Sequence, residues 1–149
     1  MAIQQIETML FLIMMNPLKM AKLKQALASE GNILVCFIFG SEAKGIARAA
    51  SDVDIALLLK EVLPSEKRLS LKLKVANKLS CILGREIDLV ILNNAGNLLK
   101  YQVVSKGKLV FERKKGLAKK FSLNVIKEYF DYLPTFEFHY ERLKEKAHG

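Results

Sequence analysis

The stretch GSEAKGIARAASDVDIALLL, residues 40–59, joins the end of one apolar segment to the start of another and places two aspartates at the junction. The segment before it, ILVCFIF at residues 33–39, is rich in branched and aromatic residues and is predicted to form a buried strand. Residues 52–59, DVDIALLL, predict a second strand. The sequence therefore predicts two apolar strands that meet at an acidic edge.

Asp52 and Asp54 are one residue apart on the second predicted strand. Because side chains alternate faces along a strand, both aspartates should point one way while Val53 and Ile55 point into the core. Two half-buried like charges repel each other, and no basic residue lies between them to compensate. A bound divalent cation is the simplest compensation, and Mg²⁺ prefers one or two carboxylates together with phosphate oxygens and water.

A third acid, Asp88, lies in the apolar segment EIDLVIL, residues 86–92, which predicts a third strand. If the second and third strands are neighbours, Asp88 stands beside the aspartate pair. Three carboxylates that face one space suit a two-metal phosphoryl or nucleotidyl transfer, in which one ion activates the attacking hydroxyl and the other holds the triphosphate.

Gly40 and Ser41 directly follow the first predicted strand. A glycine lets the backbone approach a ligand closely, and a helix that begins at Ser41 would offer N–H groups to phosphate. This is not a P-loop, because Ile and Ala occupy positions 46–47 where Lys and Ser/Thr are required, and a G-x-G-x-x-G dinucleotide motif is absent. The sequence therefore indicates a phosphate site of another kind.

Composition indicates one folded domain, since 149 residues with 51% hydrophobic and 26% charged side chains exclude general disorder. Cys36 and Cys81 lie in apolar patterns and are interpreted as two buried thiols of a cytoplasmic protein. The apolar strip at residues 8–15 is too short to span a bilayer and lacks the flanks of a signal peptide, so no membrane association is expected.

The net charge of +9 is concentrated in residues 100–120, which hold eight Lys and Arg against the single acid Glu112. Such a cluster is compatible with a polyanionic partner. A solvated lysine-rich face is the simpler explanation, so direct nucleic-acid binding is not favoured.

The other expected elements are mainly helical. They are helices at 17–30, 41–48, 64–83 and 95–105, a short strand at 108–111, and a helical segment at 117–146 that is broken near Pro134. The fold class is therefore α/β (α+β), one mixed sheet flanked by helices. We expect a domain at 1–116, with 1–16 as an extension, and a tail at 117–149 that packs on the domain or on a partner.

Aromatic residues recur along this tail at helical spacing. Ile126 and Phe130 are expected to pack in the core, and Tyr129, Phe136 and Tyr140 are candidates for contact with a partner.

The pattern GS…SDVDI…EIDLVIL resembles the minimal nucleotidyltransferase (MNT) branch of the polymerase beta-type nucleotidyltransferase superfamily, over roughly residues 33–111. The resemblance implies a polymerase beta-like fold and two Mg²⁺ ions with ATP as substrate. It further implies that Gly40 and Ser41 hold the triphosphate, that Asp52 and Asp54 bind Mg²⁺, and that Asp88 completes the metal and base site.

Lys44 stands where relatives in this branch often have arginine, so the resemblance makes it a nucleotide-binding candidate that lacks the planar guanidinium fork. The segment YQVVSKGKLVFER, residues 101–113, and the aromatic tail are similar to antitoxins of HEPN/MNT toxin–antitoxin systems. Such antitoxins are described as transferring AMP from ATP to a tyrosine of a HEPN ribonuclease, which implies a hetero-oligomer with that toxin.

Only about forty residues follow the predicted core, which by the usual size of domains is too few for a separate acceptor domain, so we expect the acceptor to be another protein. Two other functions stay open. One is nucleotide transfer to a small molecule or a nucleic-acid end, and the other is a non-catalytic antitoxin that inhibits by binding alone.

Overall fold

The computed structural model describes residue 6, residues 16–39 and residues 52–148, with every side chain of these except that of Phe136. The expected helix at 41–48 and the apolar strip at 8–15 lie outside the described residues. The elements are α2 (Pro17–Ser29), β1 (Ile33–Phe39), β2 (Val53–Leu59), α3 (Ser65–Leu83), β3 (Ile87–Ile91), the 3₁₀ turn η1 (Leu92–Asn94), α4 (Asn97–Lys106), β4 (Lys108–Glu112) and α5 (Leu117–His148).

The described strands form one mixed sheet with the order β3-β2-β1-β4. β1 is antiparallel to both β2 and β4, whereas β2 and β3 are parallel. The mixed sheet and its flanking helices confirm the expected fold class.

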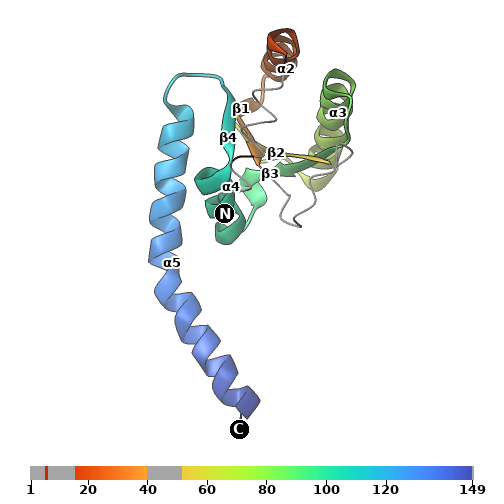
Figure 1. Ribbon diagram of the computed structural model, residues 1–149. Coiled ribbons are helices and arrows are strands. Elements are labelled where there is room, and N and C mark those ends of the chain that lie inside the picture. The colour runs from red at the N-terminus through yellow and green to blue at the C-terminus, as the bar shows by residue number, and fades with distance from the viewer. Residues whose placement is uncertain (1–5, 7–15, 40–51, 149) are drawn as a thin grey trace.

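Helices cover both faces of this sheet (Figure 1). On one face, Ile55 of β2 belongs to a core cluster with Leu79 of α3 and residues of α2. On the other face, Ala56 belongs to a second cluster with Val103 of α4 and Ala118 of α5. Because β2 is covered on both sides, nearly all of its side chains are buried, which explains its continuous apolar sequence.

Local side-chain chemistry sets several helix ends. The Asn16 carboxamide accepts a hydrogen bond from the Leu18 N–H at 2.7 Å and so caps α2. α3 ends at Gly84, whose φ of 67° is the left-handed conformation that glycine adopts readily. The Glu112 carboxylate accepts from the Gly116 N–H at 2.9 Å, just before α5 begins.

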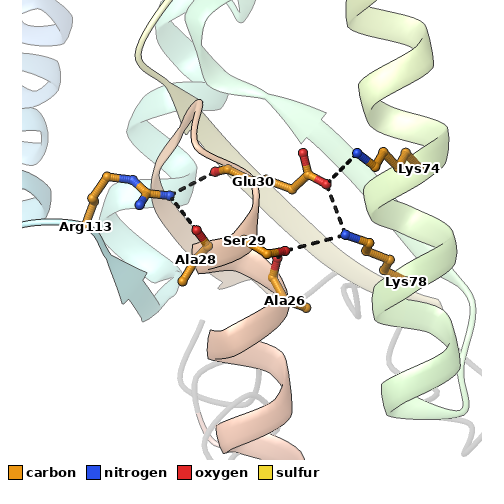
Figure 2. A network of polar contacts seen from close by, with 7 residues as sticks. All are labelled: Ala26, Ala28, Ser29, Glu30, Lys74, Lys78 and Arg113. Atoms are coloured by element: carbon orange, nitrogen blue, oxygen red, sulfur yellow. Dashed lines mark hydrogen bonds and ion pairs between the residues drawn. The ribbon is translucent and has the colours of Figure 1, made fainter.

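Arg113, at the end of β4, connects three segments of the chain (Figure 2). Its guanidinium donates to the backbone oxygens of Ile33 at 2.8 Å, Glu30 at 2.9 Å and Ala28 at 3.3 Å. These carbonyls lie at the C-terminal end of α2 and the start of β1, where helix carbonyls lack partners within the helix. Arg113 therefore has a structural role that its place in a basic cluster did not reveal.

The Glu30 carboxylate lies between Arg113 and α3, where it pairs with Lys74 at 3.0 Å and Lys78 at 3.1 Å (Figure 2). Burial alone would raise the pKa of Glu30, but the hydrogen bonds and charges of the two lysines outweigh it, and the net pKa is lowered. This network holds the end of α2 against α3.

The break expected near Pro134 is wrong, because α5 is continuous from Leu117 to His148 with Pro134 inside it. Proline removes one backbone hydrogen bond, but it can be accommodated by a kink where the helix is exposed to water. Figure 1 shows that α5 changes direction along its length and that its C-terminal half extends beyond the sheet.

Two burial expectations are also wrong. Phe130 is 56% exposed, because α4 and the sheet cover only one side of α5; Val125 is buried there instead. Cys81 is exposed, whereas Cys36 is buried, and both are free thiols. Cys81 lies two residues from the buried Leu79, which places it on the solvent side of α3.

Among the described residues, no helix combines the length and apolar character needed to cross a membrane.

Candidate functional site

Asp54 is the second residue of β2, a strand with neighbours on both sides. Asp54 is only 7% exposed, which is exceptional for a carboxylate among otherwise apolar neighbours. Its register partner on β1 is Phe39, the residue directly before Gly40, and its register partner on β3 is Asp88. The end of β1 and the starts of β2 and β3 therefore meet at one edge of the sheet.

Asp54 and Asp88 occupy paired positions on parallel strands. Register partners on neighbouring strands point to the same face and are about 4.8 Å apart in the hydrogen-bonding direction. The expectation that the second and third strands are neighbours, with Asp88 beside Asp54, is confirmed. Sequence patterns could not supply this, because the order of strands in a sheet depends on long-range pairing.

Asp52 directly precedes β2 and is exposed, as is Asp88. The two aspartates of the D-x-D pair therefore differ in burial, since Asp54 is buried and Asp52 is exposed. The expectation that both are half-buried is wrong. A backbone hydrogen bond holds the start of β2 in place. The Val53 N–H donates to the backbone oxygen of Glu86, the residue directly before β3, at 2.8 Å. Asp52 thus stands at the solvent side of the edge, and Asp54 stands at its buried side.

Asn93 holds β2 and β3 together at the opposite end, a role that no sequence pattern predicted. Its carboxamide accepts from the Leu59 N–H and donates to the Leu59 oxygen, each at 2.8 Å. These two bonds continue the strand pairing beyond β3. They help to fix the register that sets Asp54 against Asp88.

The carboxylates fit Mg²⁺ by donor type, since they supply hard oxygen ligands from two adjacent strands. Within the described ranges 16–39 and 52–148, however, no three His, Cys, Asp or Glu side chains form a ready-made metal set. Asp52, Asp54 and Asp88 therefore do not form such a set by themselves. Mg²⁺ commonly takes one or two carboxylates and completes its shell with phosphate and water. Gly40, Ser41 and Lys44 lie outside the described residues.

A surface hollow of about 340 Å³ lies elsewhere, lined by Asn32, Leu63, Lys67, Ser70, Leu71 and Lys74. Asn32 directly precedes β1 and Leu63 lies after β2. The acids lie instead where β1 ends and β2 begins, so the hollow is at the opposite end of these strands. It is no part of the carboxylate site.

The sequence profile of the family described as Polymerase beta, Nucleotidyltransferase matches residues 21–116, more than half of the chain. The chain belongs to this nucleotidyltransferase family. The matched range includes β1 to β4 and therefore both strands that carry Asp54 and Asp88.

Similarity to an individual protein is more specific than the match to the family. The chain is 39% identical over 72 residues to Protein adenylyltransferase MntA of Shewanella oneidensis, a match that covers 48% of this chain and 49% of that protein. It thus spans about half the length of the curated relative.

Two solved structures share the fold over 87% of this chain and 99% of theirs. One is a toxin–antitoxin with AMP-PNP, at 26% identity and a TM-score of 0.66. The other is tri-AMPylated Shewanella oneidensis HEPN toxin in complex with MNT antitoxin, at 24% identity and a TM-score of 0.66.

Proposed function

We propose that the chain is the antitoxin of a HEPN/MNT pair and transfers AMP from ATP to a tyrosine of its cognate HEPN toxin. The observation that carries the proposal is the register that sets Asp54 of β2 against Asp88 of β3, beside the strand that leads into Gly40 and Ser41. A binding protein without catalysis would have no need to keep a buried carboxylate next to a second one, because burying charge is unfavourable.

In the proposed site, Gly40 and Ser41 hold the triphosphate, and Lys44 adds a positive charge to it. Asp52 and Asp54 hold Mg²⁺, with two ions when the site is full, and Asp88 completes the metal set and accepts the proton of the attacking hydroxyl. Bound Mg²⁺ would neutralise the phosphate charge that develops during transfer. The pairing of β2 with β3 supports this proposal, because it sets the positions of Asp54 and Asp88 side by side.

The reaction forms one bond and breaks one bond. The tyrosine oxygen attacks the α-phosphorus of ATP, the bond between that phosphorus and the bridging oxygen to the β-phosphate breaks, and pyrophosphate leaves. The phenolic proton passes to Asp88. Since positioning dominates such transfers, docking of the toxin must bring its hydroxyl into line with the departing pyrophosphate.

The relatives support this proposal in two ways. The curated relative is named as a protein adenylyltransferase, and a solved structure of similar fold at 26% identity is a toxin–antitoxin with the ATP analogue AMP-PNP. We therefore propose ATP as the nucleotide, a HEPN toxin as the acceptor and a hetero-oligomer of the two in the cytoplasm.

The test is the rate of AMP transfer to the cognate HEPN toxin, with labelled ATP and Mg²⁺. Asp54→Asn keeps the shape of the side chain but removes a charged ligand, so transfer should fall by a factor of roughly 10² or more. Asp131→Asn on α5, which removes an exposed carboxylate elsewhere, is the matched control and should leave the rate unchanged. Equal rates for Asp54→Asn and the parent would refute the assignment of the site.

A further inference from the structure

The C-terminal half of α5 presents an apolar strip that the domain itself does not bury. In Figure 1 this half of the helix projects away from the sheet. Tyr140 is 50% exposed and Leu143 is 66% exposed, and Leu133 is half-buried. Exposed apolar side chains along one line of a helix are typical of an interaction surface rather than of a solvated tail.

The apolar positions of α5 follow alternating steps of three and four residues for three heptads. We call these positions the α5 seam: Ile126, Tyr129, Leu133, Phe136, Tyr140, Leu143 and Ala147. This spacing is that of the a and d positions of a coiled coil, so it fits a second helix packed alongside. An isolated surface helix would need no such repeat.

The first part of the seam already packs against a helix. The Tyr129 ring stacks on Tyr101 of α4 with the ring centroids 3.9 Å apart, and Ile126 is half-buried. From Leu133 onward the seam positions keep the same spacing, but the side chains of Tyr140, Leu143 and Ala147 are exposed. The seam is therefore continuous with a helix–helix contact inside the molecule and extends beyond the end of that contact.

We propose that the distal seam, from Leu133 to Ala147, docks an apolar helix of the partner toxin. This inference rests on the proposed function for the identity of the partner. The bound helix would continue the line of α4 along α5 and place the toxin on the side of the domain that α4 and α5 cover.

The side chains directly beside the distal seam are more often basic than acidic, which suits an acidic partner better than a parallel second copy of this chain. His139, Arg142 and Lys146 each precede a seam position and Lys144 follows one, whereas the acids Glu137 and Glu141 each follow one. In a parallel pair of identical helices, His139 of one copy would face Lys144 of the other, which gives no attraction and becomes repulsive when the histidine is protonated. A toxin helix with acidic residues beside its apolar strip would complement these positions.

Phe138 provides the matched control on the same helix. It is 59% exposed, close to Leu143, but lies about 140° around the helix from it. The Arg142 guanidinium lies 5.7 Å from the centre of the Phe138 ring, a contact made within α5. Phe138 is thus apolar and exposed without belonging to the seam.

The test is the affinity of Leu143→Glu and Phe138→Glu proteins for the HEPN toxin, measured by calorimetry without ATP. Both variants add one negative charge at an exposed site of α5, so neither should unfold the domain. We expect Leu143→Glu to weaken binding about tenfold or more and Phe138→Glu to change it by less than about threefold. Equal affinities for the two variants, or no binding of the toxin by the parent, would overturn the inference.

Sedimentation of this chain without the toxin tests whether the seam binds a second copy of the chain instead. A dimer that Leu143→Glu dissociates would mean that the seam binds a second copy, and the inference would be wrong. The outcome is separable from the proposed function. AMP transfer with unchanged affinity of Leu143→Glu would refute seam docking alone, whereas seam-dependent binding without AMP transfer would refute the proposed function alone.

Discussion

Replacement of Arg113 by alanine should destabilise the fold although the side chain lies in a lysine-rich surface segment. The change removes guanidinium contacts to three backbone oxygens at 2.8–3.3 Å and leaves the end of α2 without its cation. A hydrogen bond from a charged group contributes roughly 1.5–3 kcal/mol net, and a cation at a helix C-terminus about 0.3–1 kcal/mol. Water can replace part of these contacts because Arg113 is exposed, so we expect a loss of about 2 kcal/mol in the free energy of unfolding.

Lys114→Ala is the matched control, since it removes the same charge from the next residue, which is also exposed. It should change the free energy of unfolding by less than about 0.5 kcal/mol. Urea denaturation followed by circular dichroism measures both, and the melting temperature of Arg113→Ala should fall by roughly 4–8 °C. If the two variants were equally stable, the structural role of Arg113 would be refuted and the whole cluster would be a solvated basic face.

Three other outcomes follow from single positions. Gly107→Ala should lower stability by about 1–3 kcal/mol in urea melts, because the added Cβ would lie 2.5 Å from a backbone oxygen of α4, whereas Gly96→Ala meets nothing within 4 Å and should be tolerated. Glu30 has a lowered pKa in the folded state, so its stabilising contribution is complete at pH values above its ordinary pKa of 4.5 and is lost as the pH falls through the lowered pKa. The difference in free energy of unfolding between the parent and Glu30→Gln should therefore disappear in acid. A difference that persists there would contradict the ion pairs of Glu30. In native protein a thiol reagent should label exposed Cys81 readily and Cys36 only upon unfolding, since burial raises the pKa of Cys36; equal labelling rates would argue against the assigned burial.

The strands could be predicted from the sequence because each is short, apolar and bounded by turn residues. Residues 33–39 match β1 without change, and residues 52–59 match β2 apart from Asp52. The D-x-D pair and the later aspartate indicated the site for a physical reason, since acids are rare in buried strands. Their pairing became definite only with the parallel register of β2 and β3.

Other features depend on tertiary contacts that local patterns do not contain. The carboxamide of Asn93 and the guanidinium of Arg113 each satisfy backbone groups of distant segments, at 34 and 80 residues' separation. The exposure of Phe130 depends on how far α4 extends along α5, which no local pattern reports. Pro134 predicted a helix end because proline usually interrupts a helix, but α5 continues through Pro134 into its exposed half.

The most direct test of the central claim is the intact mass of the HEPN toxin after incubation with this chain, ATP and Mg²⁺. We expect a gain of one or more AMP units on the toxin, located on a tyrosine by peptide mapping. With the Asp52→Ala, Asp54→Ala double variant, the toxin should still bind but keep its original mass. An unchanged toxin mass with the parental chain, or AMP found instead on a small molecule or an RNA end, would refute AMP transfer to the toxin.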